Sequence, residues 1–352
     1  MADLPACSGN SGIAVVMVLW VLAILITLSL SFAYISRTNL SASANVKEMV
    51  KANMIAEAGI NQAVVEILHR RANPTDDARW KIDGVFRKID FADGSYKIRI
   101  VSEHGKVDLN AADDILLKGL LNALGIDNDT QDIIVDSIQD WKDPDDLVRL
   151  HGAESDYYMS LPHPYKAKNA PFDSIEELLL VRGITPEIFY GNGTKKGLKD
   201  VVTIYNNQNA TININTAPKE VLMALPNMTE DMANQIIERR NTLEFKQFSE
   251  LQTMFPDVSS PAMIKYIDQG FTEGDVFMID SIGNTTAYKG ASGIKAVVSL
   301  QNNNLSYLYY KTPETFDLSS GENAGDTEQN TDTQQDTGTE HNTGTQQNTG
   351  SK

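Results

Sequence analysis

The residues best suited to chemistry in this sequence are carboxylates gathered in one short stretch, DWKDPDD at 140–146 followed by GAESD at 152–156. Such oxygen-rich loops suit a hard cation such as calcium, which takes about six to eight oxygen ligands in a flexible geometry. The candidate metal ligands are Asp140, Asp143, Asp145, Asp146, Glu154 and Asp156. The spacing is not that of an EF-hand, because the turn glycine and the terminal glutamate are out of register. From spacing alone an acidic, solvated turn around Pro144 is favoured over a metal site, and Glu154 could instead pair with Arg149.

Catalytic motifs do not accompany these carboxylates. The 5 histidines form no HExxH or other paired arrangement, and the sequence contains no GxSxG, P-loop or GxGxxG pattern. Any two carboxylates can be drawn as an acid and a base, but that assignment needs a cleft and perturbed neighbours. We therefore expect a protein that binds other molecules and is not an enzyme.

The overall charge argues against nucleic acid as a partner. The chain of 352 residues has a formal net charge of -17, whereas affinity for nucleic acid rests mainly on clustered Lys and Arg. Cys7 is the only cysteine, so the chain forms no internal disulfide. The length suffices for one large or two ordinary domains.

An uncharged run near the N-terminus has the length of a membrane span. It reads IAVVMVLWVLAILITLSLSFA at 13–33, and a bilayer core needs about 20 helical residues. A secretory signal peptide would have a shorter apolar region preceded by basic residues, and a buried core helix would be shorter too. Basic residues follow the span and none precedes it, so the positive-inside rule alone favours a cytoplasmic C-terminal part. Apolar residues then recur at helical spacing without a proline as far as Arg71, which predicts one continuous helix.

Beyond this helix, the pattern predicts strands at both ends of a long helical region. Alternation predicts a strand at 95–102, paired as a hairpin with a second strand at 106–110. Three more strands are predicted at 276–282, 293–300 and 305–311, separated by turn residues. The sheet is thus interrupted by a helical insertion.

The insertion contains an internal repeat. The segment starting NAADDILLKGLL at Asn110 parallels NTAPKEVLMALP at Asn215, and each predicts a helix, a short turn and a second helix. Each unit is followed by a shorter one, for which Ser174 and Ser249 are the expected helix caps, with Glu176 or Glu177 and Gln252 reaching back to free N–H groups.

These units resemble the helix-hairpin-helix class, which in many proteins grips the DNA backbone. A membrane-anchored DNA-binding protein is therefore the alternative hypothesis. The hairpins read LGIDNDTQD and LPNMTEDM, so acidic residues stand where phosphate would approach exposed backbone N–H groups. Helix packing is the favoured interpretation.

The N-terminus resembles that of type IV pilins and pseudopilins, whose precursors carry a short leader ending in glycine before the apolar helix. Gly12 and Ile13 match that junction, and the resemblance implies cleavage between them by a prepilin peptidase and methylation of the new amine. Most members carry glutamate at the fifth mature position, where Met17 stands here. This departure, the run WVLAILITLSLSFAYISRTNL and the KVDLN and ININ segments before the two units are similar to the minor pseudopilin K family of type II secretion.

The resemblance implies a role and a location. The chain would sit in the cell inner membrane as a single-pass protein with its globular part in the periplasm. It would form the tip of the pseudopilus with the I and J minor pseudopilins and initiate its assembly for protein export. The resemblance also implies calcium bound by the helical domain, which shifts the interpretation of the carboxylates at 140–156 toward a metal site.

The predicted fold is α+β: a long N-terminal transmembrane helix, then a pilin-like helix-plus-antiparallel-sheet domain with a large inserted all-helical domain. The predicted parts are a leader at 1–12, the transmembrane helix at 13–33, the pilin-like domain at 34–110 and 271–317, the helical domain at 111–270 and a disordered acidic tail at 318–352. The tail has no apolar residue after Ala324 and cannot bury enough surface to fold.

Overall fold

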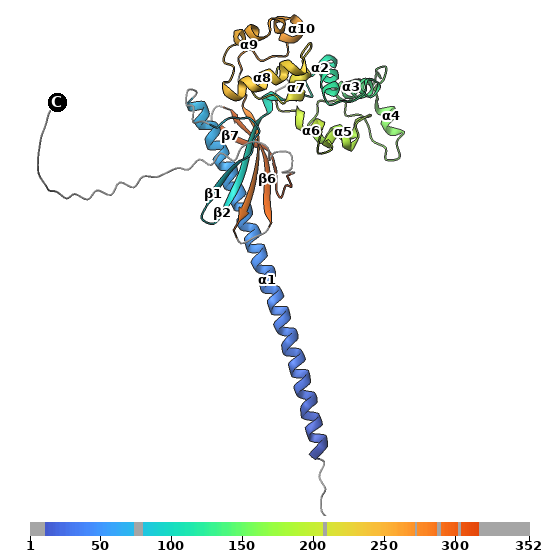
Figure 1. Ribbon diagram of the computed structural model, residues 1–352. Helices are drawn as coiled ribbons and strands as arrows, with labels where there is room; N and C mark the ends of the chain where they lie inside the picture. The colour runs from blue at the N-terminus through green and yellow to red at the C-terminus, as the bar shows by residue number, and fades with distance from the viewer. Residues whose placement is uncertain are drawn as a thin grey trace, which may run out of the picture.

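Helix α1 (Ser11–Ala72) dominates the computed structural model and carries the folded head at its C-terminal end (Figure 1). The structure describes residues 11–73, 80–206, 210–271, 273–286, 290–301 and 304–316. At 1.5 Å per residue, the 62 residues of α1 span about 93 Å. The most apolar 18-residue window of α1 has a mean hydropathy of 2.7, and among the described helices only α1 is long and apolar enough to cross a membrane.

The predicted leader and tail lie almost entirely outside the described part of the chain. Residues 1–10 and 317–352 are not described, and Gly12 and Ile13 are described only as backbone of α1. Cleavage between Gly12 and Ile13 therefore stays a prediction, as does disorder of the tail.

The C-terminal half of α1 packs on a sheet. Ala56, Ile60, Ala63 and Ile67 of α1 belong to one buried cluster with apolar side chains from the strands. Helix and sheet approach closely at two glycines, Gly59 of α1 and Gly283 of the sheet. A Cβ at Gly59 would lie 2.2 Å from Ser281 Oγ, and one at Gly283 would lie 2.1 Å from the carbonyl oxygen of Ala52. Larger residues at Gly59 or Gly283 would push the helix off the sheet.

The sheet is antiparallel, with strand order β1-β2-β5-β6-β7. Its strands are β1 (Arg87–Phe91), β2 (Gly94–Ser102), β5 (Val276–Thr285), β6 (Ala291–Gln301) and β7 (Asn304–Lys311). Together with α1 and the helical insertion between β2 and β5, it confirms the predicted α+β fold.

The predicted hairpin between 95–102 and 106–110 is wrong. The strand β2 pairs with β1 and with β5, whereas Val107–Asp108 forms the short strand β3, parallel to β4 (Val202–Thr203) in a separate sheet. The separation has a local cause: Ser102 Oγ accepts a hydrogen bond from His104 N and starts the 3-10 helix η1 (Glu103–Gly105), which turns the chain out of the sheet.

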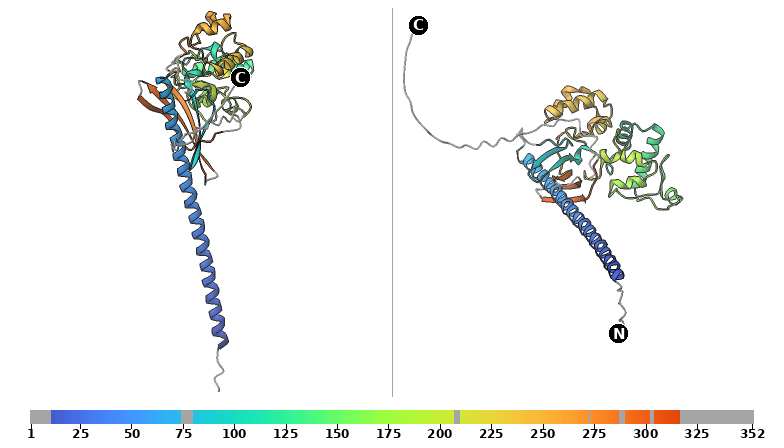
Figure 2. Two further views of the ribbon diagram at one scale, coloured as in Figure 1. Left: turned by 60° about the vertical axis from the view of Figure 1, so that its left-hand side comes forward. Right: turned by 60° about the horizontal axis from the view of Figure 1, so that its bottom comes forward.

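The insertion folds as a helical domain with its own buried core. Its elements are α2 (Asp114–Ala123), α3 (Asn128–Lys142), α4 (Ser155–Met159), η2 (Ile175–Leu180), α5 (Pro186–Tyr190), α6 (Leu198–Val201), α7 (Lys219–Met223), α8 (Glu230–Thr242), α9 (Phe248–Met254), η3 (Pro256–Ser259) and α10 (Pro261–Ile264). Figures 1 and 2 show this domain at the end of the sheet opposite the free half of α1.

The internal repeat is visible in matching hydrogen bonds. The side chain of Asn110 bonds the backbone of Phe172 in both directions, with Nδ2 donating to the carbonyl and Oδ1 accepting from the amide. The side chain of Asn215 bonds the backbone of Phe245 in the same way. The two hairpins α2–α3 and α7–α8 meet where a Cβ at Gly119 would lie 2.2 Å from the carbonyl oxygen of Ala224.

A half-buried cation completes each unit. Lys142 Nζ donates to the carbonyl oxygens of Leu109 and Ala112 at 2.9 and 3.0 Å. In the second unit, one guanidinium nitrogen of Arg240 donates to the carbonyl oxygens of Ile214 and Ala217. Burial lowers the pKa of Lys142 to about 8 and that of Arg240 to about 10.

The two expected caps have different outcomes. Ser174 caps η2, and Glu177 reaches back to the cap backbone, so this capping box is confirmed. The expectation for Ser249 is wrong, because α9 begins two residues earlier than a cap at Ser249 allows and its N-cap position is Gln247. Glu250 accepts from the backbone of Lys246 in this unit.

One side chain of α1 joins the pilin-like part to the helical domain. Arg70 is 5% exposed. Its guanidinium pairs with Glu273, which precedes β5, and lies 2.6 Å from the carboxylate of Glu244, which follows α8. It also donates to the carbonyl oxygen of Trp80 at 3.1 Å. Arg71 and Lys81 add bonds to the backbone of Gly274 and Asn241. The C-terminal turn of α1 is therefore fixed to both domains.

Substituting Arg70→Met should lower the free energy of unfolding by about 3 kcal/mol, because it leaves two partly buried carboxylates without their cation. Urea denaturation of the detergent-solubilised chain, followed by tryptophan fluorescence, measures this. The matched control is Lys88→Met, whose ion pair with Asp90 is exposed and should contribute at most about 1 kcal/mol. Equal losses in the two variants would contradict the assignment.

Candidate functional sites

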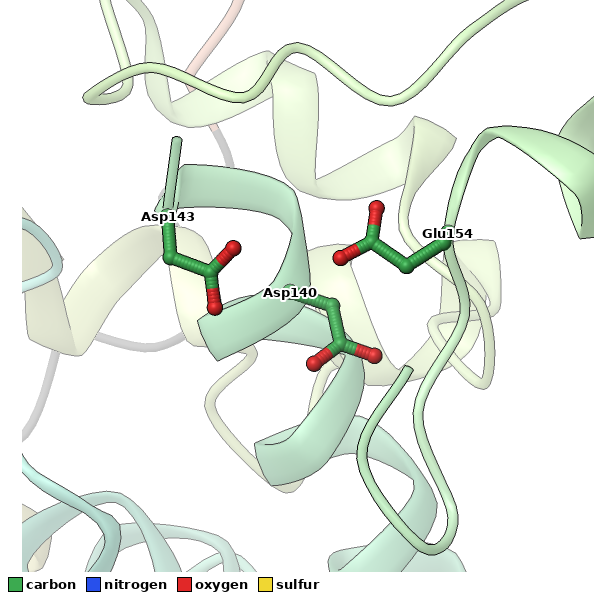
Figure 3. Close-up of side chains that lie close together, drawn as sticks. All are labelled: Asp140, Asp143 and Glu154. Atoms are coloured by element: carbon green, nitrogen blue, oxygen red, sulfur yellow. The ribbon is translucent and has the colours of Figure 1, made fainter. Parts of the chain in front are cut away.

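Three of the six predicted metal ligands come together in the structure. Asp140 lies in the last turn of α3, Asp143 follows that helix, and Glu154 precedes α4. One carboxylate oxygen from each lies within 4.8 Å of the others. Figure 3 shows the three carboxylates gathered between the end of α3 and the segment that leads into α4. We call these three residues the acidic trio.

Two members of the trio are buried, Asp143 is half-buried, and the three carboxylates are incompletely bonded. Asp140 is 0% and Glu154 4% exposed, and neither oxygen of Glu154 has a hydrogen-bond partner. Asp143 Oδ1 is likewise buried without a partner. Buried carboxylates in native proteins are normally hydrogen-bonded or bound to a cation, because desolvation of the unpaired charge is costly. These orphaned oxygens fit a bound divalent cation.

The electrostatics of the trio point the same way. Burial, followed by the charges of Asp140 and Asp143, raises the pKa of Glu154 to about 7. Burial is also the main cause of the raised pKa values of Asp140 and Asp143. A cation among the three groups would oppose both effects and favour the ionised forms.

The loop after α3 wraps around Asp140. The backbone amide of Arg149 donates to both oxygens of Asp140, at 3.4 and 3.2 Å, and the Arg149 guanidinium lies 3.7 Å from the same carboxylate. Gly152 is required here, since a Cβ would lie 2.0 Å from Asp140 Oδ2. The expected alternative partner of Glu154, Arg149, pairs with Asp140 and Asp114 instead.

The other predicted ligands lie around the trio but outside it. Asp145, Asp146 and Asp156 are exposed. Asp145 accepts from the amide of Leu147, and Asp146 accepts from Asn169 at 3.1 Å. The charges of Asp145 and Asp146 still raise the pKa of Glu154. Asn169, which sequence reasoning missed, adopts a positive φ of 49° and has a buried, unpartnered Oδ1.

The hairpins that suggested DNA binding present carboxylates where phosphate would sit. Asp127 caps α3 by accepting from Thr130 N at 3.0 Å, and Thr229 caps α8 by accepting from Met232 N. The first turns add Asp129, Glu230 and Asp231. Side-chain oxygens therefore occupy amides that a phosphate would need, and negative charge surrounds them.

A second candidate site lies beside α1, on the edge strand β7. The side chains of Leu305, Tyr307, Leu308 and Tyr310 are 42–47% exposed. Natural edge strands are usually protected by charge, proline or a covering element. The opposite edge strand, β1, is charged, with the sequence RKIDF, whereas β7 reads NLSYLYYK and carries charge only at its end.

Exposed residues of α1 continue this apolar surface. Asn53 accepts hydrogen bonds from Ser292 and Thr312 and so fixes that side of α1 beside the end of β7. Glu57 lies close enough to contribute to the raised pKa of Tyr307 and Tyr310, for which burial is the main cause. The exposed Val50, Met54 and Val65 lie near the direction of Glu57 on α1, at spacings of seven, three and eight residues from it.

We call this set the α1–β7 surface; its members are Val50, Met54, Glu57, Val65, Leu305, Tyr307 and Tyr310. Tyrosine-rich apolar surfaces of this kind are typical of protein interfaces. Sequence analysis missed it, although the run LSYLYY at 305–310 in the last predicted strand carries no charge, which is a signal for an edge that another chain covers.

Comparison with known proteins points to one family. Two family models, both described as type II secretion system protein K, match residues 98–191 and 212–263. The type II secretion system protein K of Aeromonas hydrophila is 24% identical over 315 residues, covering 81% of this chain and 92% of that protein. The protein K of Pectobacterium carotovorum is 30% identical over 138 residues, which are 38% of this chain and 40% of that protein.

A solved structure shares the fold. The crystal structure of the GspK–GspI–GspJ complex from the type 2 secretion system of enterotoxigenic Escherichia coli contains a chain that matches with a TM-score of 0.57. The match covers 80% of this chain and 99% of that chain at 17% identity. The family models, the aligned relatives and this fold together support a place for the chain in the type II secretion system protein K family.

Proposed function

We propose that this minor pseudopilin forms the tip of the periplasmic pseudopilus with the I and J minor pseudopilins and initiates its assembly for protein export. Its apolar helix half would hold it in the inner membrane by a single span, with the head in the periplasm. The α1–β7 surface carries the proposal, because it extends the exposed apolar surface of the membrane helix upward onto an unprotected strand edge. The name of the related complex supports I- and J-type subunits as its partners.

The position of the helical domain supports a tip. It lies at the membrane-distal end of the sheet (Figures 1 and 2), where the next subunit of a growing fibre would stack. Met17 adds no carboxylate to the membrane helix, so this subunit cannot neutralise the N-terminal amine of a neighbour. Both features leave lateral partners possible and obstruct partners above.

Partner binding should depend on the α1–β7 surface. Tyr307→Arg places a charge at its centre and should weaken the complex with I- and J-type pseudopilins by at least about tenfold, as loss of a tyrosine hot spot does. Affinity of the purified, detergent-solubilised subunits measures this. Phe91→Arg on the β1 edge, 42% exposed, is the control and should bind normally. Failure of the unchanged chain to bind either subunit would contradict the proposed role itself.

Maturation is the second test. A prepilin peptidase should cleave after Gly12, leaving Ile13 with an N-methylated amine, because a polar leader directly meets the apolar helix there. Mass spectrometry of the N-terminal peptide reads this out. Gly12→Glu should block cleavage, whereas Asn10→Ala in the same leader should not. A mature chain beginning near Ser36 would falsify the pilin-type interpretation.

We further propose that the acidic trio binds calcium as a structural ion. Asp140, Asp143 and Glu154 would supply carboxylate ligands, and the ion would supply positive charge that fixes the α3–α4 loop. Exposed Asp145, Asp146 and Asp156 would complete the negative field around it. The orphaned, buried oxygens of Glu154 support this proposal.

Glu154→Gln separates a metal site from an acidic turn, because the two predict opposite signs. Without metal, the substitution removes a buried charge and should raise the melting temperature by about 3 °C. Calcium should raise the melting temperature of the unchanged chain, and the Glu154→Gln variant should lose most of that increase. The matched control is Glu238→Gln, which removes an exposed carboxylate from α8, the corresponding helix of the second unit. Identical melting of the unchanged chain in calcium and in chelator would rule out the site.

A further inference from the structure

The outer face of the sheet, turned away from α1, collects positive charge. Ile98 and Ile100 point into the core under α1, so Lys97 and Arg99 between them point outward. The register places Lys88 opposite Lys97, and it aligns Arg99, Asp280, Lys295 and Lys311 in one row across four strands. This face therefore carries five cations in a chain whose formal net charge is -17.

Two of these cations lack a carboxylate. Lys88 pairs with Asp90, Arg99 with the buried Asp280, and Lys311 with Glu314, at 2.8, 2.6 and 2.8 Å. Glu176 of the helical domain adds its charge near Lys311. Among the described residues, no carboxylate forms an ion pair with Lys97 or Lys295. The unbalanced positive charge of the face is thus centred on Lys97 and Lys295.

The described chain ends on this same face. Glu314 N donates to the carbonyl oxygen of Gly293 at 2.8 Å, and a Cβ at Gly293 would collide with the Glu314 carbonyl oxygen at 2.2 Å. Phe316 packs edge-on against Phe86 at 6.3 Å between ring centroids, and Lys295 Nζ lies 6.0 Å from the Phe316 ring centroid. Everything C-terminal to Phe316 therefore leaves from beside Lys295.

The sequence that follows is complementary in charge. The segment 318–352 contains acidic residues from Glu322 to Glu340 and a single basic residue, Lys352. A segment tethered at the edge of a surface reaches an effective concentration of about millimolar order, so weak contacts suffice to hold it. Like charges at Lys88 and Lys97, directly opposite in the sheet, repel each other and favour an anion beside them.

We propose that the acidic tail, residues 318–352, binds in cis across the outer face of the sheet through Lys97 and Lys295. The tail then shields the only strongly basic face of the described sheet. An acidic segment of a partner protein could use the same face only by displacing the tail.

Lysine labelling tests the proposal residue by residue. Three detergent-solubilised chains are acetylated briefly and analysed by peptide mass spectrometry: the full chain, a chain ending at Asp317, and a full-length chain with a neutralised tail. The neutralised tail carries Glu322→Gln, Asp326→Asn, Glu328→Gln, Asp332→Asn, Asp336→Asn and Glu340→Gln. At about 20 mM salt, Lys97 and Lys295 should react about threefold more slowly in the full chain than in the other two. At about 0.5 M salt the difference should vanish.

Lys219, which pairs with Glu230 on the helical domain, is the internal reference and should react equally in all three chains. Equal rates for Lys97 and Lys295 at low salt overturn the proposal. Protection that persists with the neutralised tail overturns its electrostatic basis, and protection lost on tenfold dilution shows binding between copies and not in cis. The neutralised tail keeps its length, so altered folding of the truncated chain cannot mimic the expected result.

Discussion

The structure depends on one helix that must serve two environments without a break. Residues 13–33 of α1 carry no charge, as a helix surrounded by lipid on every face would require. The upper half needs an apolar stripe toward the sheet and polar residues elsewhere. Gly59 and Gly283 let helix and sheet meet at backbone distance, so the head is held by a helix that leaves the membrane without a hinge. Movement or anchoring of that helix is transmitted directly to the sheet.

The helical domain shows how a duplicated unit acquires two uses. Both units keep the same internal frame, in which Asn110 or Asn215 bridges two segments and Lys142 or Arg240 satisfies buried carbonyl oxygens. In the second unit, Glu244 after the second helix receives Arg70 of α1, so that corner attaches the domain. In the first unit, the corresponding corner holds the acidic trio with oxygens that no protein group bonds. The protein supplies a cation to this corner in the second unit, whereas in the first unit the proposed calcium ion would supply it.

Sequence reasoning worked where the signal was local and failed where it depended on pairing. The helix through Arg71 and the strands β5, β6 and β7 follow from apolar periodicity. The strand β1 was missed because RKIDF is half charged, and β3 was assigned to the wrong partner because its neighbour β4 lies far along the chain. Of the six predicted carboxylates, burial alone separates Asp140 and Glu154 from Asp156, and burial depends on how the α3–α4 loop wraps. No spacing rule contains that information.

The two edge strands of the sheet differ in charge and therefore in what can bind to them. Charges along β1 discourage any strand or apolar helix from adding there, whereas the tyrosines and leucines of β7 invite contact. One end of the sheet is covered by the helical domain, and Glu314 and Phe316 lie on the outer face. Contact with other pseudopilins is then left mainly to the side where α1 and β7 lie together. On the proposed function, a subunit with one apolar side and a covered membrane-distal end would suit the start of a fibre better than its middle, because a middle subunit needs a neighbour above as well as beside it.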